Sequence, residues 1–308
     1  MSGHWTPRDI PDLTGRTVVV TGANAGLGLE ITRILAANGA RVLMACRNPA
    51  KAEAAAADVL AAQPRGTVEV RPLDLANLAS VDALADRIRA EEPTLHLLVN
   101  NAGLMAVDES HTEDGFEMQL GVNHLGHFAL TAGLMPVLLA TPGSRIVSMS
   151  SMGHRAGRMR FDDLNAQRHT YRRWPAYFQS KLANLLFTLE LQRRLGPDAP
   201  TQALAAHPGG SRTDLGFEGR SWTNAVMRGP IDRFLQSAYA GALPTVRAGV
   251  DPNARGGEYY GPRYLMVGRA VRETPSRRAR NAADARRLWE LSEQLTGHVI
   301  TVDPAAGA

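Results

Sequence analysis

The stretch "TVVVTGANAGLGLEITRILAANG", residues 17–39, decides the fold class. Its first five residues are β-branched, and a continuous run of this kind predicts a strand covered on both faces. Three glycines, Gly22, Gly26 and Gly28, then lead into a run with helical periodicity. The helix is expected to end at Gly39, a residue type common just after helix C-termini. A strand, a glycine-rich turn and a helix in this order are typical of the first unit of a doubly wound α/β sheet.

The same alternation continues along the chain. Further strands are predicted in residues 41–46, 67–75, 95–103, 143–151 and 201–209, and further helices in residues 48–63, 78–92 and about 113–140. Strands that alternate with helices at this rhythm imply right-handed crossovers and a parallel sheet. We therefore predict a single-domain Rossmann fold over residues 1–308, with a parallel sheet of about seven strands and helices on both faces.

Two segments do not fit the alternation and are interpreted as insertions. Residues 152–174 are basic and polar, whereas residues 211–250 mix glycines with large apolar side chains. The second segment is expected to form an apolar lid over the substrate; helical core and a subunit contact are the alternatives. Its large apolar residues are Leu215, Phe217, Trp222, Val226, Met227, Ile231, Phe234 and Leu235.

Composition and charge narrow the class of protein. The chain has 308 residues and one cysteine, Cys46, so no internal disulfide can form, which fits a reducing cytoplasm. We see no signal peptide and no run approaching the ~18 apolar residues of a membrane span. The net charge is +4 and arginines cluster, but no nucleic-acid-binding motif accompanies them. We expect a cytoplasmic protein with a basic, solvated surface and no nucleic-acid partner.

The glycine-rich turn has the properties of a phosphate-binding loop. A pyrophosphate needs backbone N–H groups at close range and a helix N-terminus directed at it, and glycine removes the Cβ that would block its approach. The spacing G-x-x-x-G-x-G is weak evidence alone, but here a strand precedes it and a helix follows. We predict that the cofactor-binding residues of this loop are Gly22, Asn24, Ala25, Gly26, Leu27 and Gly28.

The end of the second predicted strand bears on which dinucleotide is bound. Enzymes that bind NAD usually place a carboxylate there, whereas this chain reads Cys46-Arg47. A guanidinium can pair with a 2′-phosphate, and Lys51, one turn into the next helix, could assist. We therefore expect NADP, with NADPH preferred over NADH; the alternative is that Arg47 is a surface arginine.

The segment "PAYFQSKLANLLF", residues 175–187, carries a phenol and an amine four residues apart, at Tyr177 and Lys181. Residues i and i+4 share one face of a helix, and Pro175 suits the first turn of one. A free tyrosine titrates near about pH 10, and a neighbouring ammonium favours the phenolate. We therefore expect both side chains to face one cleft, with the pKa of Tyr177 lowered by the Lys181 ammonium.

Five motifs in order now resemble one family. They are "TGANAGLG", "NNAG" (Asn100 to Gly103), the serine pair Ser150-Ser151, "YFQSK" and "HPG" (His207 to Gly209). Together they are similar to the short-chain dehydrogenase/reductase family, and the resemblance covers roughly residues 14–297. "MACRN", "LANLLFTLEL" and "RLWELSEQLTG" further resemble the branch of retinol dehydrogenases and light-dependent protochlorophyllide reductases. The protochlorophyllide enzymes use active-site cysteine chemistry, which Cys46, at the adenosine end, does not suit.

The resemblance implies roles for four residues. Tyr177 would be the general acid in reduction and the general base in oxidation, and Lys181 would also bind the nicotinamide ribose. Ser151, favoured over Ser150, would hold the carbonyl oxygen, and Asn123 would hold a water that relays protons. The resemblance also implies cofactor contacts from Asp74, Leu75, Asn101, Ala102, Gly103, Pro208, Gly209 and Thr213. The family forms dimers and tetramers, so a homodimer or homotetramer is an open expectation.

The leading hypothesis is an NADP-dependent oxidoreductase that interconverts a carbonyl and an alcohol on a small, hydrophobic substrate. The alternative is a cofactor-sensing or interaction protein that binds NADP without turnover; such proteins typically lose one of the four catalytic residues. His124 and His127 have metal-ligand spacing on a helix but no third ligand, so no metal is expected. The arginines between Arg155 and Arg173 either grip an anionic substrate, such as a coenzyme A thioester, or form a basic surface loop.

Overall fold

The computed structural model describes residues 4–210 and 236–302. Within these residues, eight strands form one sheet in the order β3-β2-β1-β4-β5-β6-β7-β8. The first seven pair in parallel, and β8 runs antiparallel to β7 at the edge. The strands are β1 (Thr17–Thr21), β2 (Arg41–Cys46), β3 (Thr67–Pro72), β4 (Leu97–Asn100), β5 (Ser144–Met149), β6 (Thr201–Ala206), β7 (Tyr259–Pro262) and β8 (Ala270–Glu273).

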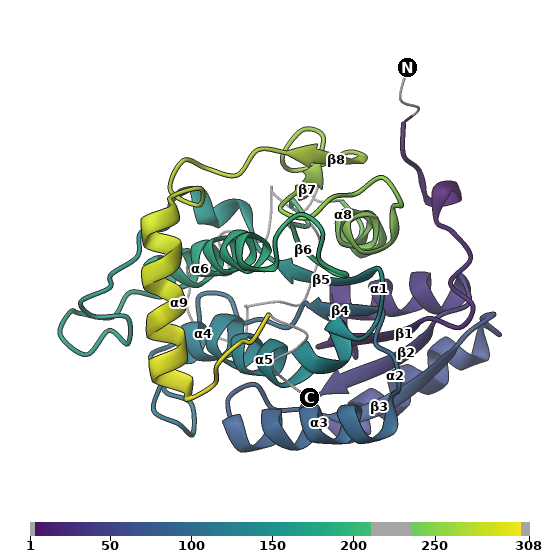
Figure 1. The fold of residues 1–308 in the computed structure, drawn as a ribbon, viewed down its shortest axis with the longest axis horizontal. Helices are drawn as coiled ribbons and strands as arrows, with labels where there is room; N and C mark the ends of the chain where they lie inside the picture. The colour runs from purple at the N-terminus through teal and green to yellow at the C-terminus, as the bar shows by residue number, and fades with distance from the viewer. Residues whose placement is uncertain (1–3, 211–235, 303–308) are drawn as a thin grey trace.

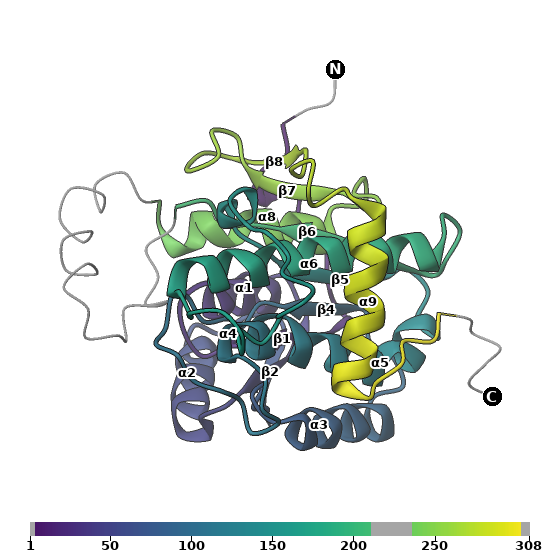
Figure 2. The ribbon, with the colours of Figure 1, turned by 90° about the vertical axis from the view of Figure 1, so that its left-hand side faces the viewer.

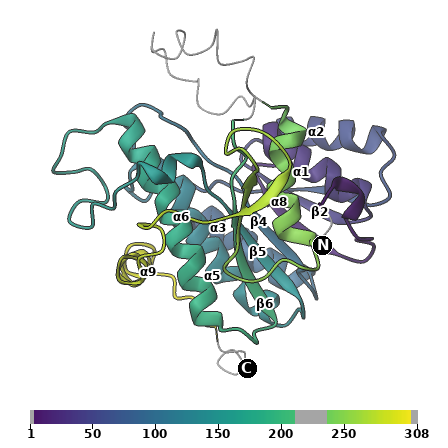
Figure 3. The same ribbon diagram turned by 90° about the horizontal axis from the view of Figure 1, so that it is seen from above.

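Helices cover both faces of the sheet, as Figures 1 and 3 show. One face carries α1 (Gly26–Ala37), α2 (Pro49–Ala61) and α8 (Ala238–Val250). The other carries α3 (Leu78–Glu91), α5 (Gly126–Leu139) and α6 (Arg173–Leu195), and α9 (Ala282–Thr296) packs on the outside of α6. The short helix α4 (Met118–Leu120) runs through one π-helical turn, Gly121–Leu125, into α5.

The hydrophobic core lies in two layers, one on each side of the sheet. Val18 and Val20 pack with α1 and α8, whereas Val19, between them, packs with α3 and α5. Alternation along the strand sends successive side chains to opposite faces, and both faces are covered, so all three valines are buried. This explains why β1 reads as a continuous apolar run.

The predicted fold class is confirmed, and all six predicted strands and the early helices are present with small shifts at their ends. The sequence analysis did not locate β7 and β8, which are four residues each. It was also wrong to treat residues 211–250 as one insertion. Residues 238–250 form α8, which packs against α1 and connects β6 to β7, so this part is helical core. The large apolar residues of that segment, Leu215 to Leu235, lie outside the described residues.

One helical stretch, Met118–Leu139, is long and apolar enough to cross a membrane by length and composition. From the sequence we had expected no run approaching the length of a membrane span. Of its most apolar 18-residue window, 83% is buried inside the fold, where α5 packs against β4, β5 and α3. It has the surroundings of a core helix (Figure 2).

Candidate active site

The sheet order places a crevice at the carboxyl ends of β1 and β4. The chain winds outward from β1 to β3 and then returns to β4 on the other side of β1, which is the switch point where α/β sheets bind ligands. The loops after these two strands touch, because a Cβ built on Gly22 would lie 3.0 Å from the Cβ of Ala102. Two of the predicted cofactor segments are therefore neighbours in space.

The glycines of the phosphate loop are required for different reasons. Gly22 and Gly26 have φ values of 65° and 52°, in the left-handed region that glycine adopts without strain. A Cβ on Gly28 would lie only 2.2 Å from the carbonyl oxygen of Gly22 and 2.7 Å from Nδ2 of Asn101. Gly28 therefore lets α1 pack directly against the turn that β1 enters.

The N-terminus of α1 is open to an anion. Its N-cap residue, Ala25, has no side chain that can accept a hydrogen bond from the first turn. Ala25 is exposed and Asn24 half-buried, whereas Leu27 packs in the core, so only its backbone can face a ligand. Free N–H groups, a glycine-lined approach and the positive end of a helix dipole fit the pyrophosphate of a dinucleotide.

The segment after β4 is fixed to β1 by a residue that the sequence analysis missed. The Thr21 hydroxyl accepts hydrogen bonds from the backbone N–H groups of Asn101 and Ala102, both at 2.9 Å. Asn101 also donates from Nδ2 to the Thr21 carbonyl. The hydroxyl lies 2.9 Å from Nε2 of His127. Burial lowers the pKa of His127 to about 3, so the ring is neutral and its Nε2 accepts a hydrogen bond from the Thr21 hydroxyl. Asn100, by contrast, braces the core by donating to Thr131 on α5.

The predicted adenosine end lies at the carboxyl end of β2. Arg47 directly follows this strand, and its side chain is exposed. No carboxylate lies within ion-pair distance of it among the described residues, so its guanidinium is available to a phosphate. Asp74 is half-buried and accepts a hydrogen bond from the N–H of Ala76, and Leu75 is buried beneath it.

Tyr177 and Lys181 lie on one face of α6, as predicted. The Lys181 Nζ is 5.9 Å from the centre of the Tyr177 ring, and both side chains are buried. Among the described residues, the ammonium has one hydrogen bond, a long one of 3.4 Å to the carbonyl of Met149. An ammonium has three donors, so two of them remain for a ligand. A Cβ on Gly103 would lie 3.1 Å from this Nζ, which puts the amine beside the segment after β4.

The electrostatics of this pair differ from the expectation. Burial raises the pKa of Tyr177, and a hydrogen bond with Ser151 lowers it only in part. Burial also lowers the pKa of Lys181, to about 8. Both groups lose hydration in the same site, which disfavours the charged form of each. The predicted lowering of the Tyr177 pKa is therefore not found for the protein's own groups, in which burial raises it.

The two serines after β5 have different surroundings. The Ser150 hydroxyl is buried and donates to the backbone carbonyl of Lys181 at 2.8 Å, which ties β5 to α6. Ser151 is half-buried, accepts a bond from the N–H of Gly153 and interacts with the Tyr177 phenol. Ser151 is thus the serine of the pair whose hydroxyl influences the pKa of Tyr177.

Asn123 lies in the π-helical turn, where one extra residue redirects the side chains. Its Oδ1 accepts from the N–H of Leu104 at 2.7 Å, and its Nδ2 donates to the Leu104 carbonyl and to the Ser180 hydroxyl, both at 2.9 Å. Both amide hydrogens are thus used inside the protein. The side chain clamps the segment after β4 onto α6, near Lys181.

A buried network that the sequence did not indicate lies behind Ser151. His154 donates from Nδ1 to the Ser151 carbonyl at 2.6 Å, and its ring meets the Tyr259 ring edge-on. The network continues on the other side of Tyr259 with His207, which stacks on the Tyr259 ring and lies 3.2 Å from the Glu273 carboxylate. These contacts link the Ser151 turn to the edge strands β7 and β8.

The predicted nicotinamide-side loop follows β6. The N–H of Gly209 donates to Nδ1 of His207, and Gly209 has a φ of 65°. A Cβ at this position would lie 2.5 Å from the Met266 carbonyl oxygen, so the loop packs tightly under the turn after β7. The Pro208 carbonyl accepts a bond from Gln236. Thr213, the last residue predicted here, lies outside the described residues.

His124 and His127 serve packing. His124 lies 2.9 Å from the Ser292 hydroxyl of α9, whereas His127 faces Thr21 and the Asn123 carbonyl. Burial lowers the pKa of His124 to about 4. In residues 4–210 and 236–302, no group of three or more His, Cys, Asp or Glu side chains is placed to hold a metal.

Comparison with known sequences agrees with this geometry. The family model for short chain dehydrogenase matches residues 16–224. Retinol dehydrogenase 13 of Homo sapiens is 41% identical over 292 residues, which cover 92% of this chain and 86% of that protein. Retinol dehydrogenase 12 of Mus musculus is 41% identical over 287 residues, which cover 92% of this chain and 87% of that protein.

Two solved structures extend the comparison. An uncharacterised protein from Mycobacterium paratuberculosis is 46% identical and superimposes with a TM-score of 0.82. The superposition covers 97% of this chain and 100% of that chain. A short chain dehydrogenase from Burkholderia cenocepacia, solved in complex with NADP, is 26% identical, with a TM-score of 0.63 over 83% of this chain and 98% of that chain. The glycine loop, the α6 pair and these similarities lead to one conclusion: the chain belongs to the short-chain dehydrogenase/reductase family of NAD(P)-dependent oxidoreductases and is retinol dehydrogenase-like.

Proposed function

We propose that the protein is an NADPH-preferring oxidoreductase that interconverts a carbonyl and an alcohol on a small hydrophobic substrate. The observation that carries the proposal is the proximity of Ser151, Tyr177 and Lys181 to one another and to the segment after β4, one of the loops predicted to bind the dinucleotide. The direction we favour is reduction. Burial raises the pKa of Tyr177, so the phenol holds its proton at neutral pH and is ready to act as an acid.

The proposed reaction divides the work between the residues of the cleft. A bound reduced nicotinamide supplies the hydride. The Ser151 hydroxyl donates to the substrate carbonyl oxygen and stabilises the negative charge that develops on it. Tyr177 gives its phenolic proton to the same oxygen, which completes the alcohol. Lys181, with two donors free, holds the nicotinamide ribose and stabilises the phenolate that remains.

The position of Asn123 supports a positioning role for it. Its amide hydrogens bind Leu104 and Ser180, so it would hold the segment after β4 and the first turns of α6 at a fixed separation. Any water in a proton relay would have to use a free lone pair on this residue rather than its amide N–H groups.

The choice of NADPH rests on Arg47, whose exposed guanidinium follows β2 where NAD-binding members place a carboxylate. A short chain dehydrogenase solved with NADP shares the fold and supports the same choice. The relatives named retinol dehydrogenase support an apolar alcohol or aldehyde as substrate. We also propose a cytoplasmic location and a homodimer or homotetramer, which cell fractionation and light scattering would test.

The test is a panel of apolar aldehydes, ketones and alcohols, with NADPH or NADH oxidation followed by absorbance. We expect turnover of at least one apolar carbonyl compound with NADPH, and a loss of about 1,000-fold in kcat for Tyr177→Phe with NADPH binding unchanged. Full activity of Tyr177→Phe on a confirmed substrate would contradict the mechanism. NADPH binding without turnover of any compound would instead support the cofactor-sensing alternative.

A further inference from the structure

The segment between Ser151 and α6 encloses a cavity that none of the proposed catalytic or cofactor residues line. Its volume is about 340 Å³, and its walls come from residues 156–172, Glu117 and the first turns of α6. In Figure 3 the teal segment before α6 extends away from the sheet. The volume is within the range of sites that bind small organic molecules.

The charge around this cavity is unbalanced toward positive. Three of its lining residues are Arg158, Arg160 and Arg172, all exposed. Within the described part of the chain, none of them has a carboxylate within 4 Å. Their neighbour Arg173 behaves differently, because it forms an ion pair with Asp108.

The two carboxylates in the same walls are already engaged by other groups. Glu117 is buried and accepts hydrogen bonds from the N–H groups of Gln119 and Leu120, at 2.7 and 2.8 Å. Asp163 accepts from the N–H groups of residues 167, 168 and 169 and from the His169 ring. Among the described residues neither carboxylate forms an ion pair with Arg158, Arg160 or Arg172, so these guanidinium groups are available to an external anion.

Two further features define the ligand. The cavity lies at the N-terminus of α6, whose N-cap residue Arg172 makes no side-chain capping bond, so the positive end of a 23-residue helix adds to the arginine charge. Leu164, Pro175, Ala176 and Phe178 give the same cavity an apolar part, beside the polar side chains of Thr170, Tyr171 and Gln179. A ligand with an anionic head and a short apolar tail satisfies both sides.

The cavity is adjacent to the catalytic tyrosine but separated from it. Ala176 and Phe178 line the cavity, and Tyr177 lies between them in the chain. The Phe178 ring lies 6.0 Å from the Tyr177 ring, centre to centre, so the cavity and the phenol share a neighbour. We propose that this cavity is a second ligand site, which binds an organic anion, a carboxylate or a phosphate with an apolar tail, next to the reacting centre.

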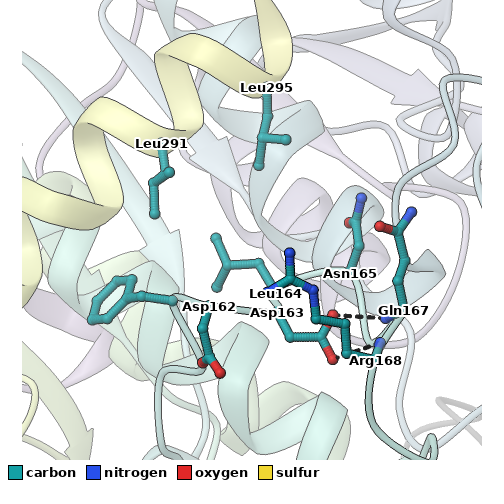
Figure 4. A pocket seen from close by; sticks show the side chains of 9 residues that line it. Asp162, Asp163, Leu164, Asn165, Gln167, Arg168, Leu291 and Leu295 are labelled. Carbon is teal, nitrogen blue, oxygen red and sulfur yellow. Dashed lines mark hydrogen bonds between the residues drawn. The ribbon is translucent and has the colours of Figure 1, made fainter.

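A neighbouring cavity on the other side of the same segment supplies a matched control. Figure 4 shows this cavity, about 190 Å³, with Asp163 and Leu164 at the wall shared with the first cavity, and Arg168 and two leucines of α9 around it. Arg168 is exposed and belongs to the same insertion, but it does not line the proposed site. A change of its charge alters the net charge of the protein without altering the proposed site.

The test is calorimetric titration of the full chain, with NADPH at saturation, so that the dinucleotide phosphates do not compete and an alcohol probe cannot be oxidised. The probes are decanoate, decyl phosphate and decanol. We expect one of the two anions to bind at one site with an affinity that falls as salt rises, and decanol to bind at least about tenfold more weakly. Comparison of decanoate with decyl phosphate identifies the head group.

The variants localise the site. We expect the pair R158E/R160E, and R172A alone, to weaken the anion about tenfold or more, and R168E to leave it unchanged. Failure of both anions to bind would overturn the proposal, as would equal weakening by R168E or equal binding of decanol. The measurement does not depend on turnover, so failure of the proposed reaction and failure of this site are separate results.

Discussion

The cleft at the carboxyl edge of the sheet has two walls that are built in different ways. The glycine wall, residues 21–28 and 101–103, depends on backbone: positive φ values, missing Cβ atoms and N–H groups that donate to no side-chain cap. The α6 wall, residues 149–151 and 177–181, depends on buried side chains whose pKa values are shifted by burial. The first wall is suited to hold a ligand in place, and the second to move a proton.

This difference shows in which wall the requirements of folding stability oppose those of ligand binding and proton transfer. On the glycine wall, close packing and ligand binding need the same geometry, so both should fail together. On the α6 wall, the buried ammonium of Lys181 costs folding free energy, because no carboxylate lies near it among the described residues. The same burial leaves its donors free for a substrate or cofactor. Each prediction below substitutes a residue of one wall and asks whether stability, ligand binding or activity is lost.

The largest effect is expected for Gly28→Ala. The added Cβ would meet the Gly22 carbonyl at 2.2 Å, a backbone atom that cannot move without opening the loop. We expect a loss of about 3 kcal/mol in the free energy of unfolding, together with a loss of dinucleotide binding. Urea unfolding and fluorescence titration with NADPH would measure the two quantities.

Gly143→Ala is the control for this change. Gly143 has a φ of 76°, but nothing lies within 4 Å of its missing Cβ. Here only the left-handed backbone is strained, so a cost of about 1 kcal/mol with normal NADPH binding is expected. If the two variants lost equal stability, close packing at Gly28 would not be the reason for that glycine.

Lys181→Met should act in the opposite direction on stability. The pKa of Lys181 is lowered from 10.5 to about 8, so the folded state binds fewer protons than the unfolded state between these pH values. Stability of the native protein therefore rises from about pH 8 to pH 10.5, and the full penalty, about 3 kcal/mol, is present below pH 8. We expect the variant to be more stable at pH 7 but inactive, with this gain shrinking at pH 10.

The other lysine of the chain, Lys51, is the control. Lys51 is exposed, so Lys51→Met should change neither the stability nor its pH dependence. Urea midpoints at pH 7 and pH 10 for the three proteins provide the measurement. A Lys181→Met protein less stable than the wild type at pH 7 would show that the amine stabilises the fold.

The serine pair separates chemistry from packing within the α6 wall. Ser151→Ala removes the donor beside Tyr177, and we expect kcat to fall about 100-fold with the fold intact. Ser150→Ala removes a buried hydrogen bond to the Lys181 carbonyl, which should cost about 1 kcal/mol of stability with kcat nearly unchanged. Steady-state kinetics and thermal unfolding of both variants would show whether the roles are reversed.

The smallest effect is expected at the outer end of the glycine wall. Arg47→Gln removes an exposed guanidinium without disturbing packing, so stability should not change. We expect the KM for NADPH to rise about tenfold while the KM for NADH stays the same, because only NADPH carries the 2′-phosphate. An equal rise for both cofactors would place Arg47 away from the phosphate.

The local patterns were sufficient for much of this molecule. β1 and β2 were predicted at their observed ends, because buried parallel strands read as unbroken β-branched and apolar runs. Tyr177 and Lys181 were predicted to share a helix face, since a spacing of four residues fixes that in any α-helix. The short edge strands β7 and β8 were missed, because four residues give little periodicity to detect.

Other features depend on contacts between distant parts of the chain. Thr21 and Asn101 are 80 residues apart, and nothing local indicates that one hydroxyl holds two backbone amides. The pKa of Tyr177 is raised by burial in the protein's own groups, and burial, unlike the neighbouring Lys181 charge, cannot be inferred from the spacing of residues. The assignment of residues 238–250 failed for a related reason: an apolar lid and a core helix have the same composition.

The sequence by itself determined the alternation of the first six strands with helices, the glycine-rich turn after β1 and the spacing of Tyr177 and Lys181, because each of these follows from local patterns over a few residues. Tertiary structure alone decided which serine faces the phenol, which protonation state burial favours, and which arginines are left without carboxylate partners among the described residues. Those properties depend on dielectric surroundings and on neighbours that come together only when the sheet and its helices have packed.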